Sequence, residues 1–134
     1  MTDIIPDLGP LGGLNSGLAV SSNIHSFFIA CDMPFINLKL IKFMIKQLGE
    51  NDIVVPRSSQ GVETLFAFYS LNCLKTIKRH IEFRNLRLLD ILNFHKVRHI
   101  SREEVGKFDP KEFSFFNVNS PRDYEEALKI WLKR

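Results

Sequence analysis

Short runs rich in Phe, Ile and Val alternate along this chain with longer segments in which apolar residues repeat at helical spacing. Runs this short, bounded by turn-forming residues, are typical of strands rather than helices. Candidate strands of this kind occupy residues 26–30, 52–56, 64–69, 97–100 and 113–118. Strands that alternate with helices predict an α/β fold with a mostly parallel sheet.

Two helices have clear start signals. Asn37 is suited to cap a helix that ends near Gly49, where a left-handed residue is expected. Ser120 and Pro121 have the residue types of an N-cap and a first helical position, so the last helix is predicted to begin there. The packing face of this last helix is predicted to carry Tyr124, Ala127, Leu128 and Trp131. Further helices are predicted at 10–20, 72–83 and 86–93.

The size and composition of the chain predict one globular domain. It has 134 residues, of which 45% are hydrophobic and 25% are charged. There is no apolar run of about 18 residues and no basic stretch followed by an apolar segment at the start, so we expect a cytoplasmic protein without a membrane span. Cys31 and Cys73 lack the spacings of metal or redox sites and are predicted to be buried thiols.

The formal charge of +3 is distributed unevenly. Residues 75–102 contain eight Lys and Arg residues against two acidic residues. One interpretation is a solvated helix face, and the other is a surface that attracts a phosphorylated ligand or partner. Aromatic and basic residues do not interleave as they do on an RNA-binding sheet, so no nucleic-acid partner is predicted.

Asp32 follows the apolar run at 26–30 and precedes Pro34, which turns the chain. Ligands of open α/β sheets collect beyond the carboxyl ends of strands. A carboxylate at such an end can hold Mg²⁺ together with the phosphates of a substrate. The alternative is an aspartate that only caps the following turn.

Glycine and asparagine provide two further candidate sites. Gly9, Gly12 and Gly13 can let a ligand approach the backbone at a helix N-terminus, although glycines in such a turn also serve packing. Asn117 and Asn119 are two residues apart and would point to the same side of a strand end, where their amides could bind a polar heterocycle or satisfy loop backbone. His95 and His99 are four residues apart, but the intervening Val97 favours a strand, which would not bring the two rings together, so a metal site from this pair is not expected.

Five blocks of the sequence, in this order, resemble those of molybdenum cofactor guanylyltransferases. They are Asp3, GPLGGL at 9–14, ACDMPF at 30–35, GVETLFAFYS at 61–70 and FFNVNSPRDY at 115–124. The resemblance implies a Rossmann-like, three-layer nucleotidyltransferase fold. It also implies an enzyme that transfers GMP from GTP to molybdopterin, with Mg²⁺ as the metal.

The resemblance also implies roles for individual residues. Asp32 matches an aspartate that binds the metal and GTP, and is the expected catalytic residue. The residues expected to contact the nucleotide are Asp3, Gly9, Gly12, Gly13 and Asp32. Asn117 and Asn119 match a pair expected to contact molybdopterin.

The sequence departs from the family pattern at its start. The family begins with a strand, a Gly-rich loop and a nearby lysine that enclose the triphosphate, and none of these occurs in residues 1–134. We therefore expect a single partial domain that corresponds to the C-terminal two thirds of the family fold. Self-association through an uncovered sheet edge is also expected. The alternatives are a non-catalytic, partner-binding α/β domain and a related nucleotidyltransferase with another acceptor.

Overall fold

The computed structural model describes residues 9–30, 33, 35–118 and 120–132. The strands are β1 (His25–Ile29), β2 (Ile53–Ser58), β3 (Gly61–Val62), β4 (Phe66–Ser70) and β5 (Val97–Ile100). The α-helices are α1 (Gly9–Ala19), α2 (Leu38–Lys46), α3 (Leu74–Glu82), α4 (Leu88–Ile91), α5 (Arg102–Gly106) and α6 (Pro121–Leu132). Short 3₁₀ helices are η1 (Leu71–Cys73), η2 (Leu92–Phe94) and η3 (Phe113–Phe115).

The strands form one mixed sheet in the order β1-β4-β2-β3, with β5 also paired to β2. Only the β2–β5 pair is parallel among the described strands, and the other strand pairs are antiparallel. The prediction that the sheet is mostly parallel is therefore wrong. β4 follows β2 without a crossover helix and therefore returns antiparallel, between β1 and β2. As a result β1, β2 and β5 still run in the same direction.

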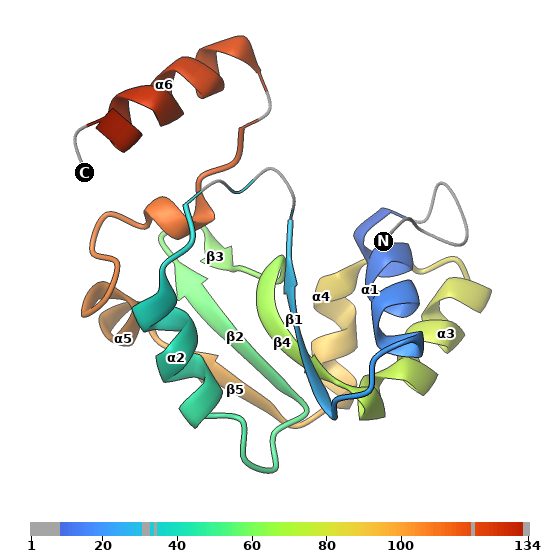
Figure 1. The fold of residues 1–134 in the computed structure, drawn as a ribbon. Helices are drawn as coiled ribbons and strands as arrows, with labels where there is room; N and C mark the ends of the chain where they lie inside the picture. The colour runs from blue at the N-terminus through green and yellow to red at the C-terminus, as the bar shows by residue number, and fades with distance from the viewer. Residues whose placement is uncertain (1–8, 31–32, 34, 119, 133–134) are drawn as a thin grey trace.

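Helices cover both faces of the sheet, which gives the three layers that were predicted (Figure 1). Side chains alternate along β2, so Ile53 and Val55 pack toward α1, α3 and α4, whereas Val54 packs toward α2 and α5. The first core contains Leu11, Leu14, Leu18, Ile53, Val55, Ala67, Tyr69, Cys73, Ile77, Leu88, Ile91 and Leu92. The second contains Met33, Leu40, Met44, Val54, Phe66, Phe68, Ile100, Val105 and Phe115.

The predicted helix starts are confirmed. The Asn37 side-chain oxygen accepts a hydrogen bond from the Leu40 N–H at 3.0 Å, and its amide donates to the Phe108 carbonyl at 2.8 Å. The Ser120 hydroxyl accepts a hydrogen bond from the Asp123 N–H at 3.1 Å. Gly49, which follows the end of α2, has φ +42°, a left-handed conformation that favours glycine.

The predicted strand at 113–118 is wrong. Residues Phe113–Phe115 form η3, and Phe116 is the extended residue that follows it. The buried Asp109 carboxylate accepts hydrogen bonds from the N–H groups of Phe113 and Ser114, at 3.1 and 2.9 Å. These local bonds satisfy backbone donors that a strand would have paired with a neighbour.

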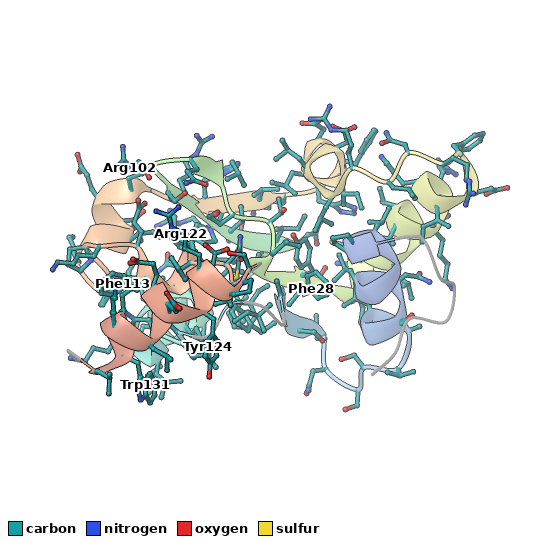
Figure 2. All side chains as sticks on the ribbon, turned by 90° about the horizontal axis from the view of Figure 1, so that it is seen from above. Phe28, Arg102, Phe113, Arg122, Tyr124 and Trp131 are labelled. Atoms are coloured by element: carbon teal, nitrogen blue, oxygen red, sulfur yellow. The ribbon has the colours of Figure 1, made fainter. Side chains whose placement is uncertain are left out.

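The face of α6 that was predicted to pack is largely exposed. Ala127 is buried, but Tyr124 and Trp131 are 58% and 59% exposed. Tyr124 and Trp131 point to one side of α6 and Arg122 to the other (Figure 2). None of the described helices is long and apolar enough to cross a bilayer.

Candidate functional site

The candidate site lies at the end of the sheet where β1 finishes. The Ala30 N–H donates to the Leu65 carbonyl at 3.0 Å, which extends the contact between β1 and the chain before β4. The Met33 N–H donates to the Ala30 carbonyl at 3.2 Å, just beyond the end of β1. Asp32 itself lies outside the described residues, as does Cys31.

Phe35, a few residues after the end of β1, contacts the segment around η3. Its ring centroid lies 6.0 Å from that of Phe113 and 6.1 Å from that of Phe116. Asn117 comes next in the chain and is exposed, while Asn119 lies outside the described residues. Two sequence blocks about 80 residues apart, one containing Asp32 and the other Asn117, therefore meet at one end of the sheet.

The glycines of the first block lie in the opening turns of α1. α1 runs antiparallel to β1, so Gly9 lies at the same end of the molecule as the last residues of β1 (Figure 1). Gly9 has φ +59° and open space around its Cβ position, whereas Gly12 is buried within the helix. The glycines thus belong to the helix itself rather than to a turn before it, and Asp3 lies outside the described residues.

Two neighbouring pockets open beside η3. The first, of about 270 Å³, has Asn37, Asp109 and Ser114 among its lining residues. The second, of about 370 Å³, has Ser58, Glu63 and Glu112 among its lining residues, together with Gln60. Burial, and then the nearby charge of Glu112, raise the pKa of Glu63.

Ser114, which lines the first pocket, carries a buried polar atom. The Ser114 side chain is buried, and its hydroxyl has no hydrogen-bond partner in the part of the chain that the structure describes. A buried hydroxyl without a partner is unfavourable unless something else binds it. Sequence reasoning missed Ser114, because its placement depends on η3.

Asp109 is a second residue that sequence reasoning missed, and its hydrogen bonds hold η3 beside the candidate site. We expect Asp109→Ala to destabilise η3 by about 1–2 kcal/mol, because two backbone N–H groups lose their acceptor. Amide hydrogen exchange at Phe113 and Ser114 should accelerate roughly tenfold. Asp90→Ala is the matched control, since the Asp90 carboxylate accepts a hydrogen bond from Asn85 far from η3. Unchanged exchange in Asp109→Ala would contradict this role.

The histidines and the described cysteine do not form a metal centre. No group of three His, Cys, Asp or Glu side chains suited to a metal occurs among the described residues. His95 instead hydrogen-bonds to Asp52 and Thr76. Cys73 is buried, as predicted, and burial raises the pKa of its thiol to about 11.

Comparison with known proteins identifies the family of this chain. Residues 1–98 match the sequence profile of the MobA-like NTP transferase domain. The chain belongs to this family. The sheet with helices on both faces is thus that of an α/β nucleotidyltransferase fold.

Relatives within the MobA-like family carry more specific names. The chain is 34% identical over 128 residues to a "Probable molybdenum cofactor guanylyltransferase" of Pelotomaculum thermopropionicum, covering 92% of this chain and 62% of that protein. It is 35% identical over 127 residues to the molybdenum cofactor guanylyltransferase of Desulfosudis oleivorans, covering 94% of this chain and 63% of that protein. The chain therefore spans about three fifths of the length of these relatives.

A solved structure of the MobA-like family has the same fold. Molybdopterin-guanine dinucleotide biosynthesis protein A from Archaeoglobus fulgidus superposes with a TM-score of 0.79 at 26% sequence identity. The superposition covers 94% of this chain and 64% of that protein.

Proposed function

We propose that this chain forms part of a guanylyltransferase site, which transfers the GMP part of GTP to molybdopterin. The observation that carries the proposal is the contact of Phe35 with Phe113 and Phe116, which joins the block containing Asp32 to the block containing Asn117. The names of the relatives from Pelotomaculum thermopropionicum and Desulfosudis oleivorans support it.

In the proposed reaction, a phosphate oxygen of molybdopterin attacks the α-phosphorus of GTP. A new P–O bond forms as the bond between the α- and β-phosphates breaks, and pyrophosphate leaves with the electron pair. The acceptor and the nucleotide are both anions, so the site has to reduce their repulsion and hold them in line.

Asp32 is the residue that we propose for binding Mg²⁺. Proteins usually bind this ion through one or two carboxylates together with substrate phosphates, and an aspartate that follows the end of a strand suits that donor set. The hydrogen bond from the Met33 N–H to the Ala30 carbonyl, just beyond the end of β1, supports the proposal. Bound Mg²⁺ supplies charge neutralisation of the phosphates.

The nucleotide and the acceptor have different proposed contacts. The N-terminal end of α1, where Gly9, Gly12 and Gly13 lie, offers unpaired backbone N–H groups of its first turn to an anion, and Asp3 helps to hold GTP. On the other side, the amides of Asn117 and Asn119 pair donors and acceptors with the pterin ring of molybdopterin.

Asp32→Ala tests the proposal directly. In a calorimetric titration with GTP and Mg²⁺, we expect the unsubstituted chain to bind saturably and Asp32→Ala to bind at least roughly tenfold more weakly. Omitting Mg²⁺ should remove most of the difference between the two proteins, because the carboxylate acts through the ion. The measurement is the dissociation constant with and without Mg²⁺.

Glu50→Ala is the matched control for this titration. Glu50 is 95% exposed and lies beyond α2, before β2, so its loss removes the same charge away from the site. Equal GTP binding by Asp32→Ala and the unsubstituted chain would overturn the metal-site assignment. Absence of GTP binding by the chain would favour a non-catalytic, partner-binding domain.

We also propose that the outer edge of β1 supports self-association. β1 pairs with β4 on one side, and its other side has no strand partner among the described residues. An open edge presents N–H and C=O groups to another strand. Light scattering should show a mass that rises with concentration toward that of a dimer, and a constant monomer mass would contradict this expectation.

A further inference from the structure

A third pocket lies at the opposite end of the sheet from the candidate active site. It has a volume of about 310 Å³ and lies between α3 and η2. Its lining residues are Lys75, Thr76, Arg79, His80 and Phe94. It adjoins the starting ends of β2 and β5, through Asp52 and His95, whereas the candidate site is at the end where β1 finishes.

Thr76, one of the lining residues, belongs to a hydrogen-bond network with His95 and Asp52. The His95 Nδ1 atom lies 3.1 Å from an Asp52 carboxylate oxygen, and its Nε2 atom lies 2.8 Å from the Thr76 hydroxyl. Burial by itself raises the pKa of Asp52, but hydrogen bonds from Asn72, His95 and Lys96 outweigh it and hold the pKa below its usual value. Asp52 therefore accepts from His95, which fixes the ring and the position of Thr76.

Two cations at the rim have no internal counter-ion. Lys75 and Arg79 are four residues apart on α3, so their side chains lie on the same side of the helix. Neither forms an ion pair with a described carboxylate; the described lysine and arginine ion pairs are those of Lys96, Arg98 and Lys129. Two adjacent cations without carboxylate partners attract an anion.

The other two lining side chains are His80, which contributes a ring nitrogen, and Phe94, which contributes an apolar surface. The His80 Nδ1 atom donates to the Thr76 carbonyl at 3.0 Å, because a carbonyl can only accept, and this leaves Nε2 for a ligand. Phe94 is 65% exposed, and its ring lies 5.4 Å from that of His80 in an edge-to-face arrangement. An exposed aromatic ring beside cations suits a ligand with both an anionic and an apolar part.

We propose that this pocket binds a small phosphomonoester, with its phosphate between Lys75 and Arg79 and its apolar part against Phe94. The volume of about 310 Å³ is in the range of small-molecule pockets. The site is distinct from the proposed guanylyltransferase site and does not depend on it, because it uses the other end of the sheet.

Phenyl phosphate is a suitable probe, and inorganic phosphate tests the anion alone. In a ¹⁵N NMR titration, phenyl phosphate should shift the amide signals of Thr76, His80 and Phe94 saturably. Lys75→Gln and Arg79→Gln should each weaken binding roughly tenfold, the loss expected for one charge-assisted hydrogen bond. Phe94→Ala should weaken phenyl phosphate but leave inorganic phosphate unchanged.

Lys78→Gln is the matched control, because Lys78 is an exposed residue of α3 that does not line the pocket. It should change the dissociation constant less than about twofold, and Asp32→Ala should leave it unchanged. Equal weakening by Lys78→Gln and Arg79→Gln would mean diffuse attraction and would overturn the proposal. It would also be overturned if phenyl phosphate gave no saturable shifts, or if it bound no more tightly than inorganic phosphate.

Discussion

Phe66→Ala is expected to lower the free energy of unfolding by about 3–5 kcal/mol. Phe66 is fully buried on β4, and its ring meets those of Phe27 and Phe115 edge to face, with centroids 5.0 and 5.4 Å apart. Removing the ring leaves a cavity between the sheet and η3, and it also removes two favourable ring contacts. Urea unfolding followed by circular dichroism measures the change.

Two further variants make the Phe66 result specific. Phe66→Leu keeps most of the side-chain volume and should cost less than about 2 kcal/mol, so it remains measurable if the alanine variant does not fold. Phe83→Ala removes an equal ring from a position that is 73% exposed, and should change the stability by less than about 0.5 kcal/mol. Similar losses in Phe66→Ala and Phe83→Ala would contradict the packing described for β4.

Asp52→Ala is expected to lower the free energy of unfolding by about 2–3 kcal/mol. Its carboxylate accepts hydrogen bonds from the side chains of Asn72 and His95, and from the backbone N–H of Lys96. The His95 side chain is only 8% exposed, so its Nδ1–H would be left buried without an acceptor. Urea unfolding at neutral pH measures the loss.

The pH dependence of this loss is a second test. The pKa of Asp52 is lowered in the folded protein, so the stability that it contributes is present above the usual carboxyl pKa of about 4 and is lost as the pH falls through the lowered value. The difference between the unsubstituted chain and Asp52→Ala should therefore shrink in acid. Glu50→Ala, which removes a 95% exposed carboxylate nearby in the chain, should show neither effect. A difference that persists unchanged in acid would contradict the network.

Local features of the sequence predicted the helix starts and most strands correctly. The caps at Asn37 and Ser120 involve backbone groups three residues away, so they depend little on the rest of the molecule. The runs at 26–30 and 52–56 were identified because both ends carry turn-forming or polar residues. The cap hydrogen bonds are complete within one segment of the chain.

Predictions failed where the outcome depended on a group outside the predicted segment. The 113–118 segment has the composition of a strand, but the Asp109 carboxylate binds its N–H groups and η3 forms instead. The mostly parallel sheet was inferred from the alternation of elements, but β3 and β4 follow β2 without a crossover helix and both run antiparallel to it. The face of α6 has helical spacing, but spacing alone does not supply a surface to pack on.

The candidate sites, too, were partly predictable from the sequence and partly visible only in the structure. The sequence blocks around Asp32 and Asn117 were recognisable from their order alone, but their meeting through Phe35 was not. The hydrogen bonds that join His95 to Asp52 and Thr76 span 43 and 19 positions, and no local pattern connects these residues. In the sequence, the pocket beside α3 was indicated only by the excess of lysine and arginine in residues 75–102.

The amino-acid sequence by itself determined the family, the fold class and the ends of the main helices, because these follow from motif order, apolar spacing and short-range hydrogen bonds. Only the tertiary structure decided the strand order and the side chains that meet at each end of the sheet. Sheet pairing joins residues far apart in the chain, and its direction depends on how each strand connects to the next.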